Sequence, residues 1–579
     1  MQPRNHEGTK NRRRRHGGIV ARVAALVIAC GVAQGALPAG PLPQAAATRP
    51  NILWILIEDA SPDMGAYGDA YAYTPRLDRM AKEGVRFTRA FSTAPVCAPS
   101  RSTLFSGMYA SSIGTLHMRS TGVPPPYVKG VGEYLRAAGY FTMNRAKTDY
   151  NISATPVEDG NGALLSQTVP LGVWDESGPD AHWRHRGAGQ PFFAVISPQV
   201  THESRLFRTA EEFAREAVHL TPADRHDPAR AVLPPYYPDT PVARANWARY
   251  YDAWTEVDGQ VADLLAELER DGLADNTIVF FSSDHGRGFP RGKRWAYDSG
   301  VRVPLLVRWP GHLTPGSVRE DLVSFVDLPP TTLSLASVAV PKHFQGQVFL
   351  GPAAASARQY VYVHRDRMDM VPDTIRAVRD RRYKYIRNFR PDLPYAQRLE
   401  YAEQVPMLQE WRRLFEAGQL RGPQLLFFAP RKPAEELYDT DIDPHEVTNL
   451  ADDPAQRARL EAMRAELDRW MKETGDLGLV PEVELKARMR PTGSWSTAAA
   501  PLMTPAGRSF ARSIKVRLSC ATEGGTVVFS TQPGSAPAWK LYTGPIALNA
   551  STLLRTKCGR LGFRDSDEVQ ARFERRPSP

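Results

Sequence analysis

The chain has 579 residues, of which 42% are hydrophobic and 23% are charged, the balance of an ordinary globular protein. This length exceeds what one hydrophobic core supports, so about two or three domains are expected. Of the formal net charge of +10, residues 1–48 carry +6, and the remaining +4 is a mild basic bias. Such a bias argues against a nucleic-acid-binding protein and is compatible with an anionic substrate.

Residues 1–48 have the features of an export signal. A basic run at 12–15 precedes a small, apolar stretch at 19–33 that is too short to span a bilayer. Cys30 ends a sequence that fits a lipoprotein cleavage box, which would give a lipid anchor, whereas the alanines at 45–47 fit an ordinary cleavage. A disordered basic tail on a cytosolic protein is the alternative. The expected location is exported: periplasmic, cell-surface or secreted in a bacterium.

The folded part opens with an apolar run at 51–57 that ends in Glu58 and Asp59. A continuous apolar run predicts a central parallel strand, and ligands of such sheets bind at the carboxyl ends of the strands. Two adjacent carboxylates repel each other unless a cation lies between them. The pair therefore favours a hard divalent cation with oxygen ligands, the alternative being a helix cap beside a solvated glutamate.

Cys97 follows next, at the start of a predicted helix. A helix that starts at 74–78 and stops at Gly84, followed by a strand at 85–91, leads to it, and Pro99 suits a first helical turn. The positive end of the helix dipole favours a thiolate or a bound anion there, and Arg101 can turn back onto the same place. The alternative is a buried structural cysteine near a helix cap.

Two later predicted strands also end in polar residues. The strand at 141–145 is followed by Lys147, and the strand at 192–196 by His202. A lone lysine at a strand end is commonly a surface charge, and a lone histidine commonly makes a structural hydrogen bond. A histidine in a polar loop past a strand end is nevertheless a catalytic candidate.

Asp284 and His285 form the second strong motif of the sequence, after the one at Cys97. They follow a buried strand at 277–281, after a long helix whose apolar stripe is typical of core packing. An aspartate and a histidine at this strand end can complete the metal site begun by the carboxylates at 58–59.

These motifs together resemble the sulfatase family, and the resemblance runs from about residue 49 to 481. Residues 57–62 and 114–119 are closest to its heparan N-sulfatase-like branch. The motifs that carry the resemblance are Cys97-Ala98-Pro99-Ser100-Arg101 with Gly107, Gly292-Lys293-Arg294, and Tyr297-Asp298-Ser299-Gly300-Val301-Arg302-Val303-Pro304.

The resemblance implies an α/β fold: an alkaline-phosphatase-like central mixed, largely parallel sheet flanked by helices, with a smaller antiparallel C-terminal subdomain. It also implies that a formylglycine-generating enzyme oxidises the motif cysteine to formylglycine, whose hydrate is the nucleophile, and that one Ca²⁺ is bound. Residue by residue, it assigns the cation to Glu58, Asp59, Cys97, Asp284 and His285, and catalysis to Cys97, Arg101, Lys147, His202 and Lys293. Two positions depart from the family pattern: Glu58 replaces an aspartate, and Asp149 replaces a histidine.

The C-terminal part has a different pattern. Short strands at 360–364, 374–379 and 382–388 predict an antiparallel meander, and the last segment alternates like a small β-sandwich. Cys520 and Cys558 are its cysteines, and an exported compartment would permit a disulfide between them. This segment resembles β-sandwich modules at the C-terminus of some chitobiases and hexosaminidases, with carbohydrate contact or a rigid spacer as its role. The expected domains are 1–48 (signal and linker), 49–350 (catalytic), 351–482 (C-terminal subdomain), 483–508 (linker) and 509–579 (β-sandwich).

The sequence thus predicts a sulfatase that hydrolyses the sulfate esters or N-sulfates of a glycan. A phosphomonoester or phosphonate hydrolase of the same superfamily is one alternative, and a non-catalytic carbohydrate-binding protein is another.

Overall fold

The structure is a computed structural model that describes residues 49–145, 147–152, 156–158, 164–167, 171–534 and 537–576. The chain from Arg49 onward forms one compact unit. The predicted export signal and Cys30 lie outside the described residues.

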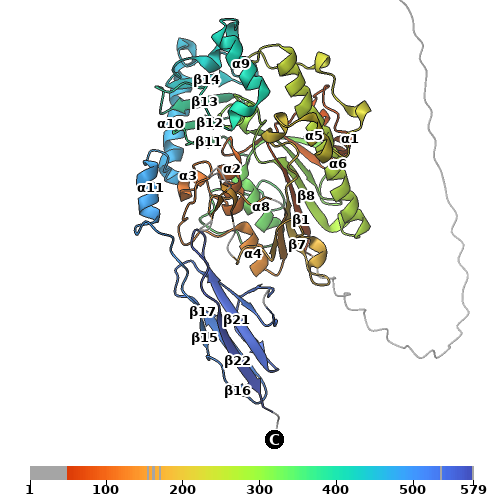
Figure 1. The fold of residues 1–579 in the computed structure, drawn as a ribbon, viewed down its shortest axis with the longest axis vertical. Helices are drawn as coiled ribbons and strands as arrows, with labels where there is room; N and C mark the ends of the chain where they lie inside the picture. Colours follow the sequence, from red (N-terminus) through yellow and green to blue (C-terminus); the bar gives the residue numbers. More distant parts are fainter. Residues whose placement is uncertain are drawn as a thin grey trace, which may run out of the picture. The chain divides into compact units, whose positions relative to one another are not determined.

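A mixed eight-stranded sheet forms the centre of the catalytic part (Figure 1). Its strand order is β10-β2-β9-β8-β1-β7-β3-β6, and every neighbouring pair is parallel except those that β9 makes with β2 and β8. The strands are β1 (Asn51–Ile57), β2 (Val85–Phe91), β3 (Phe141–Arg145), β6 (Glu176–Ser177), β7 (Phe192–Ile196), β8 (Thr277–Ser283), β9 (Arg302–Arg308) and β10 (Ser317–Ser324). The predicted mixed, largely parallel sheet is confirmed.

Helices cover both faces of this sheet, which is why β1 is apolar from Ile52 to Ile57. Leu53 and Ile55 of β1 pack into one buried cluster, and Ile52 and Trp54 pack into another on the opposite face. The first cluster includes side chains of α1 (Pro75–Glu83), α5 (Ala210–Glu216), α6 (Pro241–Arg270) and α9 (Pro406–Glu416). The second includes side chains of α2 (Cys97–Ser106), α3 (Ala110–Ile113), α4 (Val131–Ala137) and α8 (Leu328–Leu335). Two short elements complete this part: α7 (Asp298–Val301) and the hairpin of β4 (Pro156–Glu158) and β5 (Leu164–Gln167).

A second, four-stranded antiparallel sheet follows in the order β11-β12-β13-β14. Its strands are β11 (Val361–Arg365), β12 (Ile375–Arg379), β13 (Tyr383–Asn388) and β14 (Glu435–Asp439), and α10 (Arg457–Thr474) packs against it. The predicted meander is confirmed, and β14 adds a strand that the sequence analysis did not predict.

The C-terminal module consists of two small sheets around their own apolar core, at the bottom of Figure 1. One sheet has the order β15-β17-β20 and the other β16-β22-β21-β18-β19. The strands are β15 (Leu502–Thr504), β16 (Ser509–Phe510), β17 (Ile514–Ser519), β18 (Thr526–Ser530), β19 (Lys540–Leu541), β20 (Ile546–Leu548), β21 (Thr552–Gly559) and β22 (Val569–Arg575). Cys520 and Cys558 form the disulfide that the sequence permitted, with 6.4 Å between their Cα atoms.

The segment 483–508, which the sequence predicted to be a linker, holds secondary structure. Helix α11 (Glu482–Met489) begins it, and β15 pairs with β17 of the module. Among the helices of the described residues, none is both long enough and apolar enough to cross a membrane.

Candidate active site

The site lies where neighbouring strands β1 and β8 end. Glu58 and Asp59 follow β1, Asp284 and His285 follow β8, and the backbone N–H of Asp284 donates to the carbonyl of Ile57 at 2.9 Å. The backbone N–H of Asp59 in turn donates to Oδ1 of Asp284 at 3.1 Å. The parallel register of the two strands therefore brings two sequence motifs more than 200 residues apart into direct contact.

Cys97, the first residue of α2, faces these side chains. Its Sγ lies 3.3 Å from Nε2 of His285 and 3.8 Å from a carboxylate oxygen of each of Glu58 and Asp59. The ligand atoms of Asp59, Cys97, Asp284 and His285 all lie within 4.8 Å of one another, and all four residues are buried. Two buried carboxylates with an imidazole and the side chain at position 97 could hold one divalent cation, and the carboxylate oxygens are ligands of the kind that hard cations take.

Three cationic side chains surround the carboxylates. Arg101 pairs with Glu58 and donates to Asp284 at 3.0 Å, and Lys147 also pairs with Glu58. Lys293 lies 2.7 Å from Asp59. Lys147 is therefore part of the site and not a surface charge, because its side chain is only 16% exposed.

Asp149, which stands where the family pattern has a histidine, lies beside Lys147. Oδ2 of Asp149 lies 3.6 Å from Nζ of Lys147, where it can hold the lysine in place. At position 58, burial raises the pKa of Glu58 above its ordinary value, and the opposing effect of Arg101 does not cancel it. The glutamate thus needs its cationic neighbours to stay ionised.

The remaining carboxylates are firmly ionised. Burial alone would raise the pKa of Asp59, but Lys293 and the histidines outweigh it and hold the pKa well below its ordinary value. His285 and Arg101 likewise lower the pKa of Asp284 to about 2 against the effect of burial. Burial lowers the pKa of His285, but Asp284 and Asp59 overcome it and raise the pKa to about 10. His285 therefore carries a proton between two carboxylates, the place at which a cation would compete with it.

His202 caps the short helical turn Glu203–Leu206 beside the site. Its Nδ1 accepts the backbone N–H of Ser204 at 3.3 Å, which leaves the proton of a neutral imidazole on Nε2. A ligand atom of His202 lies within 4.8 Å of those of Glu58, Asp59 and Cys97. Burial, followed by the charge of Lys293, lowers the pKa of His202 to about 3, so the ring is neutral at neutral pH.

The sequence analysis missed the role of Glu203 and Arg294. Glu203 lies 2.8 Å from Lys293, accepts two hydrogen bonds from Arg294 at 2.8 and 2.9 Å, and donates its backbone N–H to Asp59 at 2.7 Å. It is 2% exposed. Glu203, which Arg294 holds in place, thus keeps Lys293 and Asp59 next to each other. The sequence offered one clue to them: Glu203 directly follows His202, and Arg294 directly follows Lys293, both of which are predicted site residues.

Comparison with known proteins shows the family of this chain. The sulfatase family model matches residues 50–338, and the model of the C-terminal region of N-sulphoglucosamine sulphohydrolase matches residues 288–397. An ulvan-active sulfatase of Formosa agariphila is 37% identical over 562 residues, which cover 90% of this chain and 91% of the relative. Human N-sulphoglucosamine sulphohydrolase is 29% identical, over 76% of this chain and 94% of the relative.

Among solved structures, the phosphonate monoester hydrolase of Silicibacter pomeroyi has the same fold, with a TM-score of 0.52 and 19% identity over 74% of this chain and 97% of its own. The fold is therefore shared by enzymes that act on different esters, and the assignment depends on the family match. With the matching family model, the full-length relative and the site geometry, this chain belongs to the sulfatase family, in its heparan N-sulfatase-like branch.

Proposed function

We propose that this sulfatase hydrolyses the sulfate esters or N-sulfates of a glycan, through a formylglycine made from Cys97 beside one Ca²⁺. The observation that carries the proposal is the convergence of three buried carboxylates and His285 on the side chain of Cys97. A hydrated formylglycine beside a divalent cation would supply an acidified hydroxyl as the nucleophile.

The residues of the chain have distinct parts in this scheme. Glu58, Asp59, Asp284 and His285 would hold the cation, with the side chain at position 97 as a further ligand. Arg101, Lys147 and Lys293 are the cations around this point, and they would bind the sulfate oxygens on which negative charge develops during the reaction. Their existing pairs with carboxylates keep them fixed before the substrate arrives.

His202 is the candidate that protonates the leaving oxygen. With a pKa of about 3, it is neutral at neutral pH when no substrate charge is nearby. A bound sulfate ester adds a negative charge next to the ring, which favours the protonated form and raises the pKa. His202 thus becomes a better acid when the substrate is present.

The relatives support a glycan as the substrate. One is named for activity on ulvan and the other for N-sulphoglucosamine. The proposal includes export, maturation by a formylglycine-generating enzyme, and a lipid anchor at Cys30 as one of two routes. The disulfide between Cys520 and Cys558 supports an oxidising compartment.

Phosphomonoester or phosphonate hydrolysis is the nearest alternative, since the fold is shared. The match of the sulfatase family model favours sulfate. The buried carboxylates and cations around Cys97 argue against a non-catalytic carbohydrate-binding protein. Burying so many charged groups carries a large desolvation penalty, and such clusters are typical of catalytic sites.

The test is turnover by wild-type enzyme and by the Cys97→Ala variant on a panel of defined sulfated saccharides, beside a matched aryl sulfate and aryl phosphate. We expect sulfated saccharides to be hydrolysed by the wild type and turnover to be abolished in the variant. Retained activity in Cys97→Ala would contradict the formylglycine scheme. A preference for the aryl phosphate would favour the phosphohydrolase alternative. Good turnover of the aryl sulfate with no activity on any saccharide would contradict the assignment of a glycan as the substrate.

A further inference from the structure

The turn that follows β21 in the C-terminal module, residues 560–563, reaches into the catalytic part. Leu561 is 5% exposed and belongs to the buried cluster on the α2, α4 and α8 face of the main sheet, together with Tyr150 and Ile152. The backbone N–H of Gly562 donates to the carbonyl of Ile152 at 3.0 Å. The module therefore contacts the segment 147–152, which carries Lys147 and Asp149.

Glycines allow this contact to be close. Gly562 has a φ of +77°, and a Cβ on it would lie 2.7 Å from Cα of Val123 and 2.8 Å from the carbonyl oxygen of Gly122. A Cβ on Gly524, whose φ is +71°, would lie 2.2 Å from the carbonyl oxygen of Pro126. Backbone thus lies directly on backbone at two points, which a larger residue would prevent.

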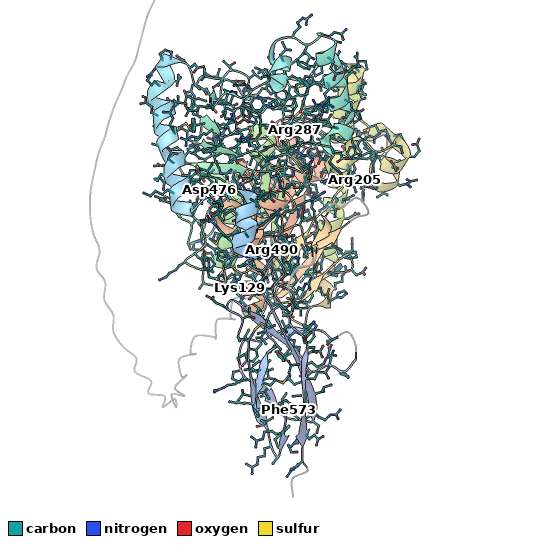
Figure 2. All side chains as sticks on the ribbon, turned by 60° about the vertical axis from the view of Figure 1, so that its left-hand side comes forward. Lys129, Arg205, Arg287, Asp476, Arg490 and Phe573 are labelled. Carbon is teal, nitrogen blue, oxygen red and sulfur yellow. A yellow bond between two sulfur atoms is a disulfide. The ribbon has the colours of Figure 1, made fainter. Side chains whose placement is uncertain are left out.

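Polar contacts hold the same interface from the catalytic side. Lys129 donates to the carbonyl of Gly524 at 2.8 Å and to the hydroxyl of Thr526 at 2.6 Å, and Thr526 also bonds Glu133 of α4. Figure 2 labels Lys129 at this junction and Phe573 inside the module. The disulfide lies at the same end, because a Cβ on Gly525 would lie within 3.1 Å of both sulfur atoms.

The segment 147–152 has a left-handed backbone at two residues. Asp149 and Asn151 have φ values of +47° and +58°, a region that Asp and Asn enter more readily than other non-glycine residues but still at some cost, so contacts that fix the segment stabilise it. Asn151 is fixed by hydrogen bonds from its side-chain amide to the carbonyls of Thr115 and His117, both at 2.8 Å, and its own carbonyl accepts the N–H of Gly122 at 2.7 Å.

We propose that the C-terminal module positions the active-site segment 147–152, with Leu561 as the positioning residue, and so holds Lys147 on Glu58. Leu561 shares its buried cluster with Ile152, and Gly562 donates to the Ile152 carbonyl. The backbone of residues 122–123, which Gly562 touches, extends the contact to Asn151. The role of Lys147 in binding sulfate rests on the proposed function, whereas the position of its side chain is given by the structure. The positioning of Lys147 and its role in sulfate binding can therefore be tested separately.

The test compares two leucine-to-alanine variants of the full chain that differ only in where the leucine lies. Leu561→Ala opens the contact with the catalytic part, whereas Leu554→Ala makes the same change inside the module's own core, where Leu554 is 0% exposed. Thermal unfolding confirms that each variant is folded at the assay temperature. Leu561→Met, which keeps the volume, serves as the conservative variant.

Two readouts are independent of turnover. The first is the rate at which an amine-reactive acylating reagent labels Lys147, followed by mass spectrometry, with buried Lys293 as the internal reference. The second is hydrogen exchange of the Gly122 amide. In Leu561→Ala we expect labelling of Lys147 to rise at least fivefold and exchange at Gly122 at least tenfold, with changes below twofold in Leu554→Ala and Leu561→Met.

Unchanged labelling and exchange in Leu561→Ala would overturn the proposal. Equal increases in Leu554→Ala would also overturn it, because they would reflect general loosening of the module. On a sulfated saccharide that the wild type hydrolyses, we expect the labelling change to be accompanied by about a tenfold loss of kcat/KM.

Discussion

The catalytic edge, meaning the residues that follow β1 and β8 together with the start of α2, and the C-terminal module achieve a fixed structure by different means. At the catalytic edge, buried charges are held by one another: Glu58 and Asp284 share Arg101, and Asp59 pairs with Lys293. The module has a thin apolar core and a disulfide. Charge removal should therefore disable the first region, whereas loss of a covalent link should weaken the second.

The largest effect should come from removing one charge at the catalytic edge. Asp284→Asn takes away an ionised partner of Arg101 and a candidate cation ligand, so we expect kcat/KM to fall by about 10³-fold or more. The matched control is Asp63→Asn. Asp63 also follows β1 and accepts a hydrogen bond from Arg287 at 2.8 Å, but it lies outside the donor cluster. Equal losses in both variants, in kinetics on folded protein, would contradict the assigned site.

The disulfide is the corresponding test of the module. Replacing Cys520 and Cys558 by serine removes a cross-link that spans 38 residues, which we expect to lower the free energy of unfolding of the module by about 3–4 kcal/mol. Calorimetry should therefore show an earlier transition for the module, and turnover below that transition should persist. An unchanged transition would mean that the apolar core alone stabilises the module.

A smaller effect should appear in acid, at a buried pair in the second sheet. Burial would raise the pKa of Asp366, but Arg376, at 3.0 Å, and His364 outweigh it and lower the pKa to about 2. The ionised form is therefore stabilising above the unfolded value of 3.8, and about 2 kcal/mol is lost as the pH falls from about 4 through 2.

Urea unfolding of the wild type and of Asp366→Asn at pH values from 7 to 3 measures this contribution. The variant should be less stable at neutral pH and should lose less stability in acid than the wild type does. Parallel curves for the two proteins would show that Asp366 is not the group responsible.

The smallest effect is expected at position 149, where the chain departs from the family pattern. Asp149 lies 3.6 Å from Lys147 and is partly exposed, so the pair contributes at most about 1 kcal/mol. Asp149→Ala should therefore change KM by less than about fivefold, with little change in kcat. A loss comparable to that of Asp284→Asn would show that Asp149 acts in catalysis and not only as a support for Lys147.

The sequence was most informative where strands are buried on both faces. The boundaries of β1 and β7 agree with the predicted runs, because continuous apolar stretches bounded by polar residues have few alternative folds. The motif residues of the catalytic edge follow β1 and β8, so their meeting point could be expected from the order of a parallel sheet.

Other parts depend on tertiary contacts that local patterns do not encode. Strand β14 is short and charged and is defined by its pairing with β13. The polar segment 206–238 buries Phe213 and Tyr236 in the main core. The pair of Glu203 and Arg294 joins residues 91 positions apart, so only the folded chain reveals it.

The most direct measurement of the central claim is mass spectrometry of the peptide that contains Cys97, from protein produced together with a formylglycine-generating enzyme. The account predicts an aldehyde in place of the thiol, and turnover that rises in proportion to the converted fraction. Full turnover by protein whose Cys97 is entirely an unmodified thiol would contradict it.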